Sequence, residues 1–247
     1  MVDIHSHILP GLDDGPRTLQ EAVAMIHMAA DAGTTDIVAT PHANDQFGYD
    51  LQVVEQKISE LLNAANKRIR IHRGCDFHLS PKNIFDALNN KQKYTINGKC
   101  YLLVELPDLM APSSLSGILT RLRSAGITPV LTHPERNTLL QERISHIEHF
   151  VEGGCLVQVT AMSILGGFGK MEQRASEYLL QRGLVHFIAS DAHDTYHRPP
   201  TLAEAHRTIL RWFGEDTATV LFVTNPHLVL SGDALPYDML RPTRQGL

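Results

Sequence analysis

The sequence predicts an α/β protein whose parallel strands close into a barrel within a single domain. Short apolar runs alternate with amphipathic helical patterns along the chain, which is typical of a parallel sheet with helical crossovers. About seven such strand and helix units follow one another in 247 residues, which favours a closed barrel. No linker, low-complexity stretch or repeat divides the sequence. We therefore expect one domain over residues 1–231 and a C-terminal tail over 232–247.

In the first half of the chain, strands are predicted from β-rich apolar runs and helices from apolar residues at helical spacing. We expect strands at Val2–His5, Asp36–Thr40 and Ile69–Arg73, and helices at Leu19–Ala32, 50–66 and Asn83–Asn90. Gly33 ends the first of these helices, because glycine readily takes the left-handed conformation of a helix terminus. The stretch Tyr94–Leu106 contains Asn97-Gly98 between two β-rich segments, which predicts a hairpin.

The second half repeats the alternation. We expect strands at Thr128–Thr132, Leu156–Thr160 and Val185–Ser190, and helices at 114–125, 139–152, 171–182 and 201–213. The glycine-rich run 166–169 lacks the spacing of a nucleotide fingerprint and is interpreted as a mobile loop near the mouth of a site.

Composition excludes several classes of protein. A formal charge of −5 gives no basic surface for nucleic acid, and 43% hydrophobic with 20% charged residues is ordinary for a soluble domain. Three scattered cysteines cannot build a disulfide framework or a Cys-rich zinc site. The N-terminal segment lacks the pattern of a signal peptide, and no apolar run approaches the ~20 residues that span a bilayer. We therefore expect a cytoplasmic protein that does not insert into membranes.

The polar motifs stand directly after apolar strands, in the segments VDIHSH, DIVATPH, CYLLVELP, PVLTHPER and HFIASDAH. In parallel α/β folds the carboxyl ends of the strands lie on one face, where the following loops form the site. The histidines and acids of five separate segments should therefore meet in space.

These residue types suit metal ions. His5 and His7 are one residue apart, so both side chains can point toward one cation, and Asp191 and His193 repeat this spacing. Imidazole and carboxylate without thiolate favour manganese, zinc or iron, and the number of candidates exceeds what one ion needs. The sequence therefore predicts a site with two or three ions. His78 and His186 flank such segments, but the sequence gives them no partner.

Other phosphatase and hydrolase chemistries lack their residues. The positions six residues after the cysteines hold Pro81, Leu106 and Ala161, so none has the arginine that a cysteine phosphatase requires. The sequence also contains no GxSxG elbow, P-loop or HExxH motif. Nucleophilic catalysis by a side chain is therefore not supported.

The motifs HSHILPGLDDG, VATPH, THPER and ASDAH resemble the PHP superfamily of polymerase and histidinol phosphatase domains. Within it, they are similar to the metal-dependent tyrosine-protein phosphatases of capsule and exopolysaccharide operons, the CpsB/YwqE type. The resemblance covers the chain from Met1 to about residue 215. It implies a distorted (β/α)7 TIM-like barrel, the PHP fold, with three divalent ions, manganese first and zinc, iron or magnesium as alternatives.

The resemblance also implies the ligands of each ion. The expected metal ligands are His5, His7 and Asp191 for the first ion, Glu105 and His133 for the second, and Asp14, His42 and His193 for the third. The family places a bridging glutamate where this chain has Gly74-Cys75-Asp76, so Asp76 should bridge the first two ions. Its side chain is shorter by one methylene and reaches about 1.5 Å less far.

A mechanism follows from charge. Three divalent ions carry more positive charge than Asp14, Asp76, Glu105 and Asp191 neutralise, and the excess matches a phosphate monoester dianion. A metal-bound hydroxide is expected to attack phosphorus in line. Arg136 is expected to clamp the phosphate and Arg198 to make a second contact with it, while Asp191 and His193 complete the catalytic set.

The residues predict a metal-dependent phosphomonoesterase, and the resemblance implies that it hydrolyses phosphotyrosine in a protein, in particular a tyrosine kinase that regulates polysaccharide synthesis. One alternative is a PHP phosphatase of a small ester such as histidinol phosphate. Another is an inactive PHP domain that only binds a partner, although retention of nearly every ligand argues against it. A nuclease is a third alternative, weakened by the acidic net charge.

Overall fold

The computed structural model describes residues 1–106 and 112–236. Its strands are β1 Val2–Ser6, β2 Asp36–Ala39, β3 His42–Ala43, β4 Arg70–Arg73, β5 Asp76–His78, β6 Tyr101–Glu105, β7 Thr128–Thr132, β8 Leu156–Thr160 and β9 Phe187–Ala189. Its α-helices are α1 Leu19–Asp31, α2 Leu51–Ala64, α3 Pro81–Asn89, α4 Lys91–Tyr94, α5 Pro112–Ser124, α6 Thr138–Glu142, α7 Ser145–Glu152, α8 Ala161–Ile164, α9 Lys170–Gln181, α10 Ala203–Thr219 and α11 Asn225–Ser231. Short 3-10 segments lie at η1 Ile96–Gly98 and η2 Pro134–Arg136, and a π-helical segment lies at η3 Val220–Thr224.

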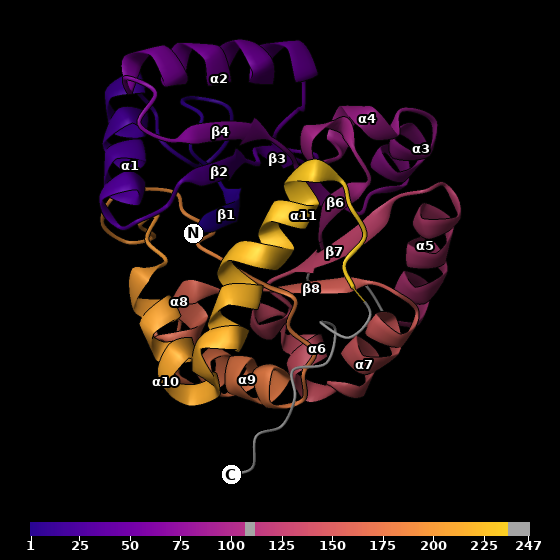
Figure 1. The fold of residues 1–247 in the computed structure, drawn as a ribbon. Coiled ribbons are helices and arrows are strands. Elements are labelled where there is room, and N and C mark those ends of the chain that lie inside the picture. The colour runs from indigo at the N-terminus through magenta and orange to yellow at the C-terminus, as the bar shows by residue number, and fades with distance from the viewer. Residues whose placement is uncertain (107–111, 237–247) are drawn as a thin grey trace.

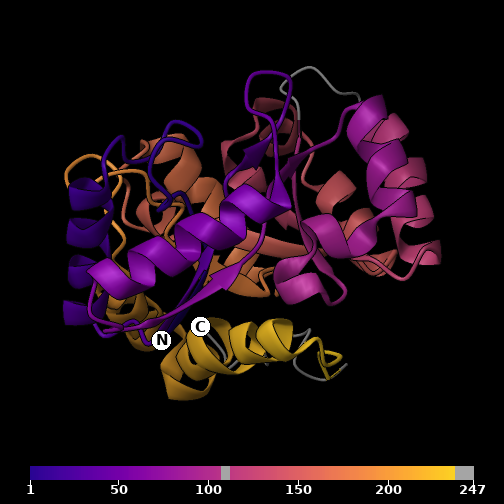
Figure 2. The ribbon, with the colours of Figure 1, turned by 90° about the horizontal axis from the view of Figure 1, so that it is seen from above.

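All strand pairs are parallel, which confirms the predicted α/β class. The strands form a three-stranded sheet in the order β1-β2-β4 and a six-stranded sheet in the order β3-β5-β6-β7-β8-β9. Helices lie on the outside: α1 and α2 flank the smaller sheet, and α8, α9 and α10 lie at the opposite end of the molecule (Figures 1 and 2). Each strand therefore directs its carboxyl end toward one face of the molecule.

The described strands do not form the single closed ring that the sequence predicted. The strand after α1 is split into β2 and β3 by Thr40-Pro41, and the next is split into β4 and β5 by Gly74-Cys75. Proline has no N–H to extend the ladder, and a Cβ on Gly74 would lie 2.7 Å from Val38. The two sheets instead meet at an isolated bridge between Ser6 and Ala192, where the His7 N–H donates to the Ala192 carbonyl at 2.8 Å.

The predicted hairpin over Tyr94–Leu106 is wrong. Asn97 and Gly98 do take positive φ angles of 51° and 68°, but their turn connects the short helix α4 to β6. Tyr94 is buried and donates its hydroxyl to Asp86, which fixes the first half of the expected hairpin as helix. Only β6 remains a strand, and it pairs in parallel with β5 and β7.

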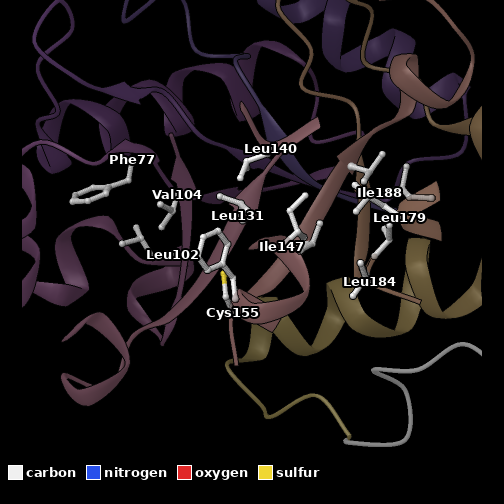
Figure 3. Close-up of a cluster of buried hydrophobic side chains, with 14 of the residues drawn as sticks. Phe77, Leu102, Val104, Leu131, Leu140, Ile147, Cys155, Leu179, Leu184 and Ile188 are labelled. Atoms are coloured by element: carbon white, nitrogen blue, oxygen red, sulfur yellow. The ribbon is translucent and has the colours of Figure 1, made fainter. Parts of the chain in front are cut away.

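Both sheets share one interior. A buried cluster contains side chains of β1 and β2 from one sheet and of β6, β7, β8 and β9 from the other, and it is closed by Val229 of α11. A larger cluster lies between the six-stranded sheet and its helices, where Phe77, Leu131 and Ile188 pack with Leu140 and Leu179 (Figure 3). Each such fully buried side chain stabilises the fold by about 1.5–3 kcal/mol. This core fixes the strand ends that carry the site.

The C-terminal segment continues as helix beyond the predicted end at residue 213, through α10, η3 and α11. Gly232 ends α11, and the Tyr101 hydroxyl donates to the Asp233 carbonyl at 2.6 Å. Most of the expected tail, residues 237–247, lies outside the described residues. In the part of the chain that is described, no helix combines the length and apolarity that a bilayer span requires.

Candidate metal centre

The histidines and acids that follow the strands lie together at one face. Ligand atoms within 4.8 Å of one another form overlapping groups, which comprise His5, His7, Asp14, His42, Asp76, His78, Glu105, His133, Asp191 and His193. All nine sequence-predicted metal ligands are in this set, and His78 is an addition. They come from the carboxyl ends of β1, β6, β7 and β9, from β3 and β5, and from the loop after β1.

His5 of β1 and His7, just after this strand, face the same pair of carboxylates. His5 Nε2 lies 3.5 Å from an oxygen of Asp76 and 3.4 Å from one of Asp191. His7 Nε2 lies 3.3 Å from His5 Nε2 and 3.5 Å from the same Asp191 oxygen. All four side chains are buried, so these Nε2 atoms and carboxylate oxygens enclose a small polar space.

The outward nitrogens of these histidines are held by partners that the sequence did not indicate. His7 Nδ1 lies 2.7 Å from Asp13 Oδ2, and His5 Nδ1 lies 2.9 Å from Gln158 Oε1. His193 Nδ1 lies 3.0 Å from the backbone carbonyl of Asp191. An acceptor at Nδ1 fixes the tautomer that leaves Nε2 unprotonated, as in metal sites where a second shell orients each histidine. The only sequence signals for these partners are a second acid in Asp13-Asp14 and a polar residue inside an apolar strand.

A second group gathers around the more open carboxylate of Asp14. His193 Nε2 lies 3.3 Å and His42 Nε2 lies 3.5 Å from Asp14 Oδ1. The rings of His7 and His193 have centroids 4.0 Å apart, so this group adjoins the first. Asp14 is the most exposed member of the centre, with half of its side chain accessible.

A third group surrounds Glu105. His133 Nε2 lies 3.6 Å from Glu105 Oε1, and His42 Nδ1 lies 3.5 Å from Glu105 Oε2. His78, on β5 two residues after Asp76, places its Nε2 in close ion-pair contact with the same Oε2. Sequence analysis left His78 without a partner, although its two-residue spacing from Asp76 on a strand places both on one face.

Two residues of the site have strained backbones. His133 and Asp191 take φ angles of 33° and 52°, a region that residues other than glycine rarely adopt. Backbone hydrogen bonds hold both residues, because the His133 N–H donates to the Gln158 carbonyl and the Asp191 N–H to the His5 carbonyl. Such strain is typical of functional residues whose direction the fold determines.

Both sequence-predicted phosphate contacts converge on Asp191. Arg136 Nη1 donates to Asp191 Oδ2 at 2.6 Å, and Arg198 Nη2 donates to the same oxygen. Arg136 also lines a cavity of about 110 Å³ together with Glu105, Leu106, Thr132, His133, Pro134 and Asn137. This cavity adjoins the metal-ligand groups, so an anion in it would contact the guanidinium.

The electrostatics of the centre favour cations. Burial opposes ionisation of Asp191, but His5, His133 and Arg198 lower its pKa well below the usual range. Burial also opposes ionisation of Asp76, yet His5 and His42 hold its pKa far down. Burial lowers the pKa of His133 to about 3 and, with the neighbouring His193, that of His7 to about 4. At neutral pH these acids are therefore ionised and these two imidazoles neutral. Burial also opposes protonation of His5 and His42, but Asp191 and Asp76 raise the pKa of His5 to about 9, and Asp14 and Asp76 raise that of His42 to about 11. A bound cation would displace the protons of these two imidazoles.

The unsatisfied polar atoms fit divalent ions. Among the described residues, neither buried oxygen of Asp76 has a hydrogen-bond partner, and the same holds for Nδ1 of His42. Buried ionised carboxylates without such partners carry a large free-energy cost, which a coordinated cation removes. Nitrogen and carboxylate donors without thiolate also match the ligand preference of manganese, zinc and iron.

Known proteins resemble this chain in sequence and in fold. CapC of Staphylococcus aureus is 36% identical over 203 residues, which cover 81% of this chain and 79% of CapC. Tyrosine-protein phosphatase CpsB of Streptococcus agalactiae is 32% identical over 239 residues, covering 93% of this chain and 98% of CpsB. A crystal structure from the pair YwqE of Bacillus subtilis and CpsB of Streptococcus pneumoniae, called unique metal-dependent tyrosine phosphatases, superposes with a TM-score of 0.90. It is 30% identical, and the match covers 99% of this chain and 100% of that one.

More distant structures share the fold alone. The phosphotriesterase of Mycobacterium tuberculosis superposes with a TM-score of 0.60 at 10% identity, covering 93% of each chain.

A family model described as "Capsular polysaccharide synthesis, CpsB/CapC" matches residues 1–231. The chain therefore belongs to the CpsB/CapC family of capsular polysaccharide synthesis.

Proposed function

We propose that this protein is a metal-dependent phosphatase that hydrolyses phosphotyrosine in a protein substrate. The observation that carries the proposal is the position of Arg136 and Arg198, which donate to one carboxylate of a dense histidine and acid cluster. A cation cluster beside two guanidinium groups is suited to the charge of a phosphoryl group. The relatives named as tyrosine-protein phosphatases support the same reaction.

We assign the ligands in three sets, of which the first two share Asp76. The sets are His5, His7, Asp76 and Asp191; Asp76, Glu105 and His133; and Asp14, His42 and His193. We propose three divalent ions, manganese first and zinc, iron or magnesium as alternatives. When bound, such ions stabilise negative charge on the phosphoryl group and activate water.

The protein's own groups bind and orient the ester. Arg136 and Arg198 present N–H donors beside Asp191, so they can hold phosphoryl oxygens in the 110 Å³ cavity that Arg136 lines. Gln158 and Asp13 hold the rings of His5 and His7 in direction. Tyrosinate, with a parent pKa near 10, leaves readily enough that no strong general acid is required.

We further propose that the two sheets correspond to a distorted (β/α)7 barrel of the PHP type within a domain over 1–231, with 232–247 as a tail. The nine strands reduce to seven when β2 with β3 and β4 with β5 are each counted as one interrupted strand. The proposed substrate is a tyrosine kinase that regulates capsular or exopolysaccharide synthesis, supported by the family to which the chain belongs, and the proposed location of the protein is the cytoplasm.

The test compares esters and metals. A phosphotyrosine peptide should be hydrolysed faster than histidinol phosphate, with activity abolished by a chelator and restored by manganese. A higher kcat/KM for the small ester would overturn the substrate assignment. Chelator-insensitive activity would overturn the metal dependence, and no turnover of any phosphomonoester would leave an inactive binding domain. Metal content per chain should be measured on protein purified without added metal.

A further inference from the structure

One aromatic side chain lies against both arginines of the proposed phosphate contact. The Arg136 guanidinium carbon lies 4.4 Å from the centroid of the Phe168 ring, and that of Arg198 lies 5.9 Å from it. Phe168 is half-buried and belongs to the glycine-rich segment between α8 and α9. Sequence analysis interpreted this segment only as a mobile loop.

The loop has a backbone that few other sequences could adopt. Gly166 and Gly169 have φ angles of 78° and 125°, which side-chain-bearing residues rarely take. A Cβ on Gly167 would lie 2.8 Å from Cε of Met162. The three glycines therefore let the chain turn tightly on either side of Phe168, which directs its ring toward the arginines.

The same corner of the fold also holds the segment that carries Arg136. Glu135 is buried, and its Oε1 accepts hydrogen bonds from the Thr160 N–H at 2.9 Å and from the Ser163 hydroxyl at 2.7 Å. Gln141 donates to the Glu135 carbonyl and lies 3.5 Å from Glu172 of α9. Glu135, the residue before Arg136, is thus held by β8, α8 and α6, while the Arg136 side chain lies against Phe168.

Stacking on a ring constrains the face of a guanidinium but leaves its in-plane N–H donors available. Arg136 and Arg198 both direct such donors to Asp191 Oδ2, although two like charges at one oxygen repel each other. The quadrupole of one shared ring offsets part of that repulsion and restricts both side chains to orientations in which they face the site.

We infer that Phe168 is a positioning residue of the phosphate clamp: its ring holds Arg136 and Arg198 in the orientation in which both bind one phosphoryl group. The inference rests on the proposed phosphatase function. It assigns Phe168 no contact with the reacting atoms, because its effect passes through the two guanidinium groups.

The test uses the metal-loaded full-length protein and inorganic phosphate as the probe. Phe168→Leu keeps an apolar side chain without a π face, and Phe168→Tyr keeps the ring. Tyr178→Leu is the matched control, because it removes a ring of α9 whose centroid lies 5.8 Å from the guanidinium carbon of Arg182, the residue after this helix. Phosphate affinity is measured both by calorimetry and as the inhibition constant against a phosphotyrosine peptide.

We expect Phe168→Leu to weaken phosphate binding and to raise KM for the peptide by roughly three- to tenfold, with a smaller change in kcat. Phe168→Tyr and Tyr178→Leu should stay near the wild type. In an Arg136→Ala background the effect of Phe168→Leu should shrink, because one of its two arginine partners is absent. Thermal melting of each variant shows whether it is folded.

Wild-type phosphate affinity in Phe168→Leu would overturn the inference, as would an undiminished effect in the Arg136→Ala background. An equal loss in Tyr178→Leu would also overturn it. Calorimetry measures phosphate binding independently of hydrolysis, so it tests the role of Phe168 separately from the proposed function. A protein that binds phosphate in a Phe168-dependent way without hydrolysing phosphotyrosine would disprove the substrate while leaving the role of Phe168 intact.

Discussion

Nδ1 of His7 lies 2.7 Å from Oδ2 of Asp13, and both side chains are almost completely buried. The other oxygen of Asp13 accepts the Gly15 N–H at 3.0 Å, so the carboxylate is itself held in place. The contact fixes which nitrogen of His7 carries the proton and directs Nε2 toward Asp191 and Asp76.

Replacing Asp13 by alanine should therefore weaken metal binding without removing a ligand. We expect a loss of about 10- to 100-fold in metal affinity or turnover, the usual effect of removing a second-shell partner. Asp13→Asn, which retains an acceptor oxygen, should lose less. Metal titration and metal content of the purified variants measure this. Asp31→Ala, which removes an exposed ion pair with Arg68, is the control; an equal loss there would contradict the assignment.

The gathering of the histidines and acids could be predicted from the sequence, whereas the residues that orient them could not. His5, His133 and Asp191 follow apolar strands, and the parallel topology alone brings such positions together. Asp13 and Gln158 each contact one histidine of the centre through one hydrogen bond, and a lone polar residue has no pattern from which such a partner can be inferred.

The fold shows the same division. Long periodic segments such as α1 were predicted within a residue or two, because an amphipathic face and the capping residue Thr18 agree on its position. The hairpin around Asn97-Gly98 was predicted wrongly, because the same two residues suit any turn with positive φ. The division of the strands into two sheets depends on tertiary packing at Gly74, which no local pattern encodes.

We expect His78 to contribute to metal binding, although the resemblance gave it no role. Its Nε2 forms a close ion pair with Glu105 Oε2, an atom that also faces His42 Nδ1, so it limits the directions that the carboxylate can take. We expect His78→Ala to reduce metal affinity or kcat by about tenfold or more. Turnover as a function of manganese concentration measures the change. The exposed His149→Ala should have no effect, and unchanged kinetics in His78→Ala would remove this residue from the centre.

Loss of Arg136 should separate substrate binding from metal binding. Arg136→Ala removes a charge-assisted donor, and such bonds contribute about 1.5–3 kcal/mol, or roughly 10- to 100-fold in kcat/KM. Metal content should stay at the wild-type level, whereas His133→Ala and Asp191→Ala should nearly abolish turnover and release metal. Steady-state kinetics together with metal analysis distinguish the two classes. Metal loss in Arg136→Ala equal to that in His133→Ala would contradict the role as a clamp.

Asp76 stands where the family has a glutamate, and variants of it test whether the shorter side chain binds metal. Both of its buried oxygens lack hydrogen-bond partners among the described residues, and its neighbours His5 and His42 approach it at 3.5 and 3.3 Å. Asp76→Asn removes the negative charge and should lower activity by 100-fold or more, on the order of the about 3–5 kcal/mol that breaking a buried charge pair costs. Asp76→Glu keeps the charge and should retain metal-dependent turnover. An active Asp76→Asn variant would exclude a ligand role for this residue.

His186, away from the metal centre, should make the stability of the fold depend on pH. Its ring is buried, its Nδ1 accepts the Val157 N–H at 3.0 Å, and burial lowers its pKa to about 4. In the unfolded chain the same group takes up a proton near pH 6.5, so below that pH the unfolded state binds more protons than the folded state. The free energy of unfolding therefore has its full value with respect to His186 above pH 6.5. It decreases as the pH falls toward 4, by an amount on the order of 3 kcal/mol.

His186→Gln should therefore unfold with a weaker pH dependence between 6.5 and 4, although its stability at neutral pH should be lower. Urea unfolding at several pH values measures the slope for each protein. His197→Gln is the matched control, since that side chain is 91% exposed and its removal should leave the slope unchanged. Identical slopes for the wild type and His186→Gln would show that His186 is protonated equally in the folded and unfolded states. At low pH the Val157 N–H would then need an acceptor other than the Nδ1 lone pair of His186.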